Sequence, residues 1–284
     1  MQKQQILVIS GALALLLGLY FFGPTVGPAK KEQKPVVVDS GTAFTIEKYR
    51  LLALSQITPA KKAYADSVEN AYKNDKSEEA VHTYLHKLST FWRDTVGDPV
   101  LHYFYESQVA ELDNTEKSLT FAAHSILGYL PFERSHDLQH WLADKGKELF
   151  EKALKINAAN DSSIVGLGGC LMYGAYEDEG GNPMEGILKV REVAARDSNF
   201  IFAQYMLGVG GVISKQYDRA VVRFTKVVNA QPNNLEAMFK LAEACELAGQ
   251  KAEAIGWYEK INQRVENREL KMELSKRIES LKKG

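Results

Sequence analysis

Apolar residues recur at spacings of three and four from about Thr45 almost to the end of the chain. This period places them along one side of an α-helix. The only stretch that suggests a β-strand is the short "VVVDS" at residues 36–40. The pattern therefore predicts an all-helical body.

The first residues have a different pattern, because Ile6 to Phe22 form a continuous apolar run without a charge. Extended to Val26 as a helix, the run reaches about 30 Å at roughly 1.5 Å per residue, which matches a hydrocarbon core. We expect an uncleaved N-terminal transmembrane anchor over residues 1–26, followed by a proline- and lysine-containing linker over 27–43. A cleaved signal peptide, with cleavage after Ala29 and secretion of the body, is the alternative.

Basic residues flank this run on both sides, so its orientation rests on two opposing arguments. Lys30, Lys31 and Lys34 outnumber Lys3, which favours a cytoplasmic body. A short head with one lysine is, however, typical of a signal anchor that exports the rest of the chain. We expect a single-pass protein of the inner (plasma) membrane with an exported, periplasmic body.

The second half of the chain repeats itself with a period of 34 residues. The reference segment, 201–234, carries Leu207-Gly208, Ala220, Phe224, Val227 and Pro232. A forward shift by the period reaches Leu241-Ala242, Ala254, Tyr258 and Ile261, and a backward shift reaches Gly186, Val190 and Val193. A further backward step of 40 residues, which allows for a six-residue insertion "YEDEGG", reaches Gly146, Phe150 and Ala153. Self-similarity at such a period indicates stacked helix pairs.

This pattern resembles the tetratricopeptide repeat, a helix–turn–helix unit, over residues 137–268. The helical region 44–136 contains one degenerate unit, with Tyr64, Val68 and Ala71 on one helix and Ala80 and Tyr84 on the next. Residues 95–136 show helices without a clean register, and "PFERSHD" indicates an interrupting loop. The resemblance implies an all-α, tetratricopeptide-type helical-repeat solenoid behind the anchor. Residues 269–284 would form its C-terminal capping helix.

The repeated positions have a packing explanation. Gly208 and Ala220 are small because the paired helices are expected to approach closely there. Phe224 and Tyr258 are expected to fill the space between one pair and the next. Pro232 cannot continue its helix, so the next unit begins after it.

Composition narrows the classes of function. Lys and Arg total 35 against 36 Asp and Glu, so no global positive field favours nucleic acid. The two cysteines, Cys170 and Cys245, exclude a disulfide framework and fall on apolar helix faces, where free cysteine is usually buried.

Candidate catalytic motifs are weak. His82 and His86, like His136 and His140, stand one helical turn apart and could share a metal ion with a third ligand. The zinc-protease motif needs Glu directly after its first His, where this chain has Thr83 and Asp137. The glycines at 166–169 and 208–211 lack phosphate-loop spacing. We expect neither catalysis nor a cofactor, and a metal-dependent enzyme using the four histidines is the alternative.

In tetratricopeptide proteins the first helix of each pair lines a concave groove, so the resemblance implies a binding surface. Its lining here would comprise Val165, Gly169, Met172, Tyr173, Phe202, Tyr205, Val209, Val212, Phe239, Glu243 and Glu246. The Lys and Asn residues that grip a chaperone's carboxylate tail in some members are replaced here, for example by Tyr205 and Glu243. An apolar, aromatic groove with an acidic end suits an apolar or amphipathic segment of another protein, with a basic flank. The chain's own upstream helices, or a second copy in a homodimer, are alternative occupants.

These features together predict a membrane-anchored scaffold or adaptor for protein–protein interaction. Envelope assembly and chaperone-like holding of a partner both belong to this class. A self-associating structural protein is a further alternative.

Overall fold

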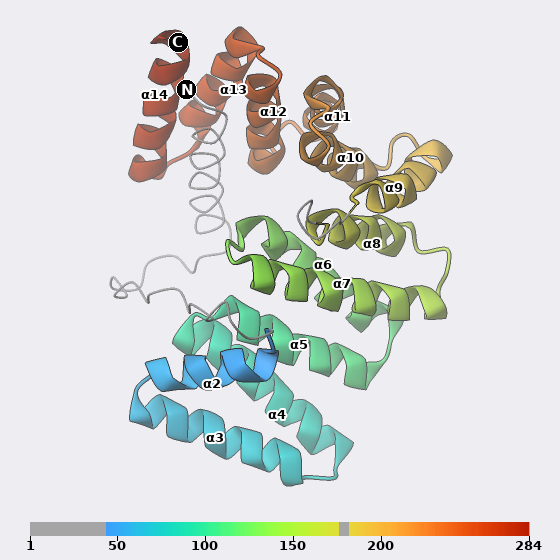
Figure 1. Ribbon diagram of the computed structural model, residues 1–284, viewed down its shortest axis with the longest axis vertical. Helices are drawn as coiled ribbons and strands as arrows, with labels where there is room; N and C mark the ends of the chain where they lie inside the picture. The colour runs from blue at the N-terminus through green and yellow to red at the C-terminus, as the bar shows by residue number, and fades with distance from the viewer. Residues whose placement is uncertain (1–43, 176–181, 284) are drawn as a thin grey trace. The chain divides into compact units, whose positions relative to one another are not determined.

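The computed structural model describes residues 44–175 and 182–283, and every regular element in these ranges is a helix (Figure 1). The all-helical prediction is therefore confirmed for this part of the chain. The predicted anchor and linker, residues 1–43, lie outside it. The elements are α2 (Ile46–Gln56), α3 (Pro59–Asn74), α4 (Glu78–Thr90), the π-helix η1 (Phe91–Val96), α5 (Pro99–Asp113), α6 (Glu116–Tyr129), the 3₁₀-helix η2 (Leu130–Phe132), α7 (His136–Ile156), α8 (Asp161–Tyr173), α9 (Met184–Arg196), α10 (Ile201–Ile213), α11 (Tyr217–Ala230), α12 (Leu235–Leu247), α13 (Lys251–Arg264) and α14 (Arg268–Lys283).

The described residues divide into two units, and the boundary falls inside α8, between Gly166 and Leu167. The first unit comprises residues 44–166. The second comprises residues 167–175 and 182–283.

In the first unit, helices that are consecutive in sequence pack against one another from α3 to α7 (Figure 1). Thr58 and Ser77 cap the N-termini of α3 and α4 with their hydroxyl oxygens, as their residue types favour. These two helices contain the positions at which the sequence predicts a degenerate unit. The helix α4 continues into η1, whose π-type turns end at Gly97 with φ of 82°, and α5 then begins with Asp98 as its N-cap.

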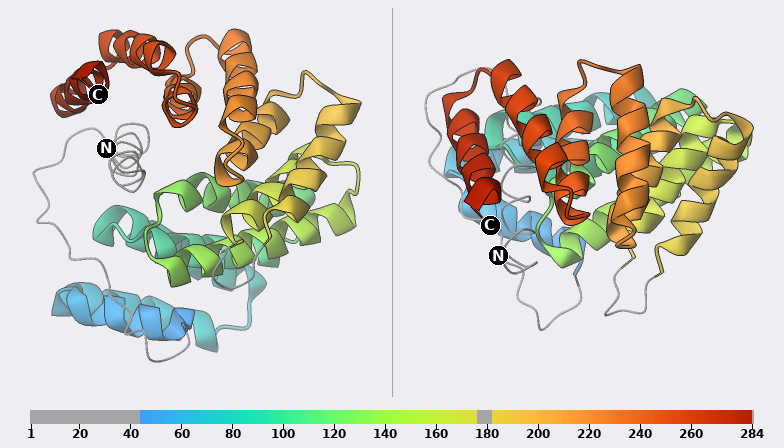
Figure 2. Two further views of the ribbon diagram at one scale, coloured as in Figure 1. Left: turned by 45° about the horizontal axis from the view of Figure 1, so that its top comes forward. Right: turned by 90° about the horizontal axis from the view of Figure 1, so that it is seen from above.

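In the second unit, the packing of consecutive helices continues from α9 to α14, and Figure 2 shows α12, α13 and α14 side by side. The turns after α10 and α12 are equivalent: Lys215 and Gly249, 34 residues apart, both have positive φ, of 60° and 79°. The backbone N–H of the residue after each donates to a carbonyl five positions earlier, at 2.7 and 2.8 Å. The repeat period thus extends to the backbone conformation of the turns.

The close helix approach predicted at Gly208 and Ala220 is confirmed, but each of these residues faces a different residue of the other helix. A β-carbon on Gly208 would lie 2.6 Å from the Phe224 ring, and one on Gly211 would lie 3.1 Å from Ala220. Phe224 is fully buried against α10 of its own pair, whereas the repeat pattern predicts it between successive pairs. The equivalent approach between α8 and α9 occurs at Gly168 and Gly186, where a β-carbon on Gly186 would meet the Gly168 carbonyl oxygen.

Two helix ends complete the second unit. The Asn182 side chain accepts from the Met184 N–H at 2.9 Å, at the start of α9. The helix α14 buries Leu270, Leu274 and Ile278 on one side, as expected of a capping helix.

Candidate interaction surface

The predicted groove residues divide by exposure. Val165, Met172, Val209 and Phe239 are each 5% exposed or less, so they belong to the helix-packing core. Tyr173, Phe202, Tyr205, Val212 and Glu243 are half-buried and keep part of their surface accessible. Any surface for a partner therefore rests on the second group.

Glu246 has a different place from the predicted acidic end of the groove. Its side chain is 5% exposed and forms a buried ion pair with Arg277 of α14, whose Nε donates to Glu246 Oε2 at 2.9 Å. The Tyr258 hydroxyl donates to the same oxygen at 3.2 Å. Because all of these bonds are internal to α12, α13 and α14, Glu246 joins the last three helices.

Three of these half-buried residues, Tyr173, Tyr205 and Glu243, lie in one cluster on α8, α10 and α12. They are joined there by the half-buried Lys240 and the exposed Glu236, and we call these five residues the Tyr–Lys–Glu cluster. The Tyr205 hydroxyl donates to Glu236 Oε1 at 2.6 Å. Lys240 Nζ donates to Glu243 Oε2 at 3.1 Å, with both side chains between a fifth and a quarter exposed. The first helices of successive pairs thus converge on a polar site framed by two aromatic rings.

The electrostatics of the cluster fix its protonation. Burial raises the pKa of Tyr173 to about 12. Burial and Glu236 raise the pKa of Tyr205 well above its ordinary value, so both hydroxyls remain donors. Glu243 raises the pKa of Lys240, which stays a cation. One ammonium against two carboxylates leaves one net negative charge, which favours a partner that supplies a cation.

The sequence prediction includes Tyr173, Tyr205 and Glu243 but misses Glu236 and Lys240. A usable signal is present, since Lys240 comes four residues after Glu236 and three before Glu243, the spacings of side-chain pairs on one helix face. A search for apolar periodicity alone does not identify such polar positions.

Two of the four histidines of the metal hypothesis lie beside carboxylates, and the His82 and His86 rings lie 4.6 Å apart. His82 Nε2 lies 3.1 Å from Asp113 Oδ1, and His140 Nδ1 lies 3.4 Å from Asp144 Oδ2. Within residues 44–175 and 182–283, no group of three or more His, Cys, Asp or Glu side chains has an arrangement that could hold a metal ion.

One buried network has the composition of a catalytic triad. Ser89 Oγ lies 2.8 Å from His102 Nδ1, and His102 Nε2 lies 3.3 Å from Glu106 Oε2. Ser89 and His102 are only 5% and 8% exposed, and helix-interior N–H groups are engaged in helix hydrogen bonds, so they offer no oxyanion donors. Burial and Arg93 lower the pKa of His102 to about 4, which keeps it neutral. We interpret this network as a polar tie between α4 and α5.

The two cysteines do not lie at the surface. Cys170 and Cys245 are buried, and burial raises the pKa of the Cys245 thiol to about 11. Among the helices in residues 44–175 and 182–283, none is long and apolar enough to span a bilayer.

Comparisons with known proteins bear on the repeat. A family model described as a tetratricopeptide repeat matches residues 212–272, from the end of α10 into α14. Among solved structures, one of MamA is 19% identical and covers 60% of this chain and 91% of its own, with a TM-score of 0.39. YrrB, described as a TPR protein with an unusual peptide-binding site, is 17% identical and covers 76% and 99%, with a TM-score of 0.39. No curated protein matches the sequence. The family match supports the tetratricopeptide assignment for the C-terminal helix pairs.

Proposed function

We propose that this chain is a non-catalytic scaffold whose second unit binds an apolar or amphipathic segment of another protein at the Tyr–Lys–Glu cluster. The observation that carries the proposal is the convergence of Tyr173, Tyr205 and Lys240 from three separate helices, each still partly accessible. Aromatic rings provide contact area at low entropic cost, and the flanking carboxylates select a basic group beside it.

We further propose that residues 1–26 anchor the scaffold in the inner (plasma) membrane, with the body on the exported side. The apolar run Ile6 to Phe22 supports an anchor, and the short head with one lysine supports export. Confinement to a membrane raises the effective concentration of any partner held there, which suits envelope assembly or chaperone-like holding.

A photocrosslinking amino acid at position 205 of the full-length protein, in its native membrane, tests the binding site. We expect crosslinks to a recurrent heterologous protein. The same photocrosslinker at Val222 of α11, which is 67% exposed, serves as the control position and should not capture that protein. Crosslinks only to a second copy would support the self-associating alternative. Crosslinks only within the chain would mean that the surface is internally occupied, and the search would move to another face.

A charge reversal tests how the partner is recognised. Glu243→Lys should weaken capture at position 205, because it replaces an acidic contact with a repulsive one. The matched control is Glu266→Lys, at an exposed position after α13. Equal loss in both variants would contradict a specific role for the cluster, and retention in both would show that its charge does not select the partner.

A further inference from the structure

A second surface lies on the first helix pair of the first unit. An open groove of about 720 Å³ runs between the start of α3, one face of α4, and η1. The residues on which the argument rests are Lys61, Tyr64, His82, His86, Lys87 and Phe91. None of them belongs to the Tyr–Lys–Glu cluster.

The floor of this α3–α4 groove is aromatic. The Tyr64 ring lies 5.1 Å from the Phe91 ring, which is buried, while Tyr64 itself is 45% exposed. On α4, Leu85 and Leu88 are buried while His82, His86 and Lys87 line the groove, so opposite faces of one helix have different roles. An accessible ring above a buried one is a contact area for an apolar side chain.

The rim of the groove is basic. Lys61 and Lys87 line it, and no carboxylate does. Lys61 Nζ donates to the Thr95 carbonyl oxygen at 2.6 Å, and Lys87 Nζ lies 5.5 Å from the Tyr84 ring, so neither ammonium is held by a carboxylate in these contacts. The Asp113 carboxylate lies beside His82 and also acts electrostatically on His86.

His86 contributes little to this charge near neutral pH, and His82 Nε2 lies 3.1 Å from Asp113 Oδ1. Burial and the neighbouring His82 lower the pKa of His86, which favours its neutral form. The two lysines therefore supply the positive potential. This is the reverse of the Tyr–Lys–Glu cluster, where carboxylates are in excess.

We propose that the α3–α4 groove binds an acidic peptide segment, which places an aromatic or aliphatic side chain on Tyr64 and carboxylates beside Lys61 and Lys87. Charge complementarity selects this occupant over a basic or neutral one. The scaffold then has two binding surfaces of opposite charge preference, and one partner segment cannot satisfy both.

The test uses full-length protein in detergent and a fluorescein-labelled peptide of about ten residues in which glutamates alternate with phenylalanine and leucine. A second peptide replaces the glutamates with lysines, and a third replaces the apolar residues with serines. Fluorescence anisotropy should show the acidic, apolar peptide binding at least about tenfold more tightly than either control. A photoreactive group on the peptide should crosslink to α3, α4 or η1.

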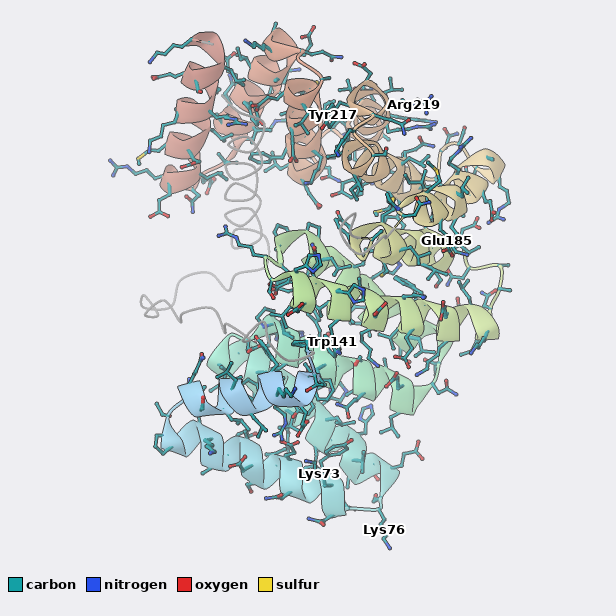
Figure 3. All side chains as sticks on the ribbon, viewed as in Figure 1. Lys73, Lys76, Trp141, Glu185, Tyr217 and Arg219 are labelled. Carbon is teal, nitrogen blue, oxygen red and sulfur yellow. The ribbon has the colours of Figure 1, made fainter. Side chains whose placement is uncertain are left out.

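Variants separate the groove from general electrostatics. Lys87→Glu should weaken binding by about tenfold or more, and Lys87→Arg should retain it. The control is Lys76→Glu, because Lys76 projects from the turn between α3 and α4, outside the groove (Figure 3). Tyr64→Ser tests the aromatic contact, with unchanged circular dichroism required of each variant.

Equal binding of the acidic and lysine peptides, equal effects of Lys87→Glu and Lys76→Glu, or crosslinks confined to α10 and α12 would overturn the proposal. The proposal would also be overturned if the protein binds no peptide and Lys87→Glu abolishes its self-association. The occupant of the groove would then be a second copy of the chain.

Discussion

Gly208 and Gly256 are both helical glycines, yet a β-carbon has opposite consequences at the two positions. At Gly208 it would lie 2.6 Å from the ring of Phe224, which is fully buried and cannot move without disturbing the pair. At Gly256 in α13 no atom lies within 4 Å. The first glycine is required by packing, whereas the second only adds conformational freedom to the unfolded chain.

We therefore expect Gly208→Ala to destabilise the protein by about 1–3 kcal/mol through overpacking. Gly256→Ala should stabilise it by about 0.5–1 kcal/mol, since alanine favours the helix. Urea unfolding followed by circular dichroism measures both. A neutral Gly208→Ala would show that α10 and α11 can separate without cost, and packing would then not explain the glycine.

The residue scale also shows where sequence reasoning ends. Gly208 and Ala220 recur at a fixed period, and that period alone predicts them as close contacts. Glu246 occupies a position that the period assigns to the groove, but Arg277 of α14 reaches it and buries it. That contact joins α12 to a helix outside its own pair, so no local pattern indicates it.

At the scale of the element, α14 is attached to the preceding helices by apolar residues and by the buried Glu246–Arg277 pair. Glu246→Ala should cost about 3–5 kcal/mol, because Arg277 is left as a buried charge and the Tyr258 hydroxyl loses its acceptor. The double variant Glu246→Met with Arg277→Leu should recover most of the loss, since apolar residues of similar volume often replace a buried pair without cost.

Hydrogen exchange locates this effect. In Glu246→Ala, amides of α14 should lose protection before those of α10 and α11. If the double variant is as unstable as the single one, the pair would contribute specific geometry that apolar packing does not supply. If Glu246→Ala is neutral, the ion pair would be irrelevant to the attachment of α14.

The same scale explains which elements are predictable. Amphipathic periodicity is a local property, so the helices and the pairs at 201–234 and 235–268 can be predicted from the sequence. The π-helix η1, which contains the buried Phe91 and Trp92, does not follow from this periodicity. The α3–α4 groove lies beside this irregular segment, which is why no repeat argument indicates it.

At the scale of the whole molecule, the proposed function depends on how the body is held. A scaffold that is free in solution meets its partner at bulk concentration, whereas an anchored one meets it at a concentration set by the linker. In the proposed arrangement that linker is residues 27–43, whose sequence contains prolines and lysines. Under this proposal, residues 1–26 determine whether the two proposed surfaces act at a membrane.

Fractionation of cells that express the full chain tests this directly. We expect it to sediment with membranes and to resist extraction at alkaline pH, because transfer of an apolar helix of about twenty residues out of lipid is strongly unfavourable. The matched variant lacks residues 1–26 and should be released. Protease added to intact spheroplasts should digest the full-length body if it is exported and spare it if it is cytoplasmic. A soluble protein whose N-terminus lies after Ala29 would instead establish that a signal peptide is cleaved. The two surfaces would then have to recruit their partners without help from the membrane.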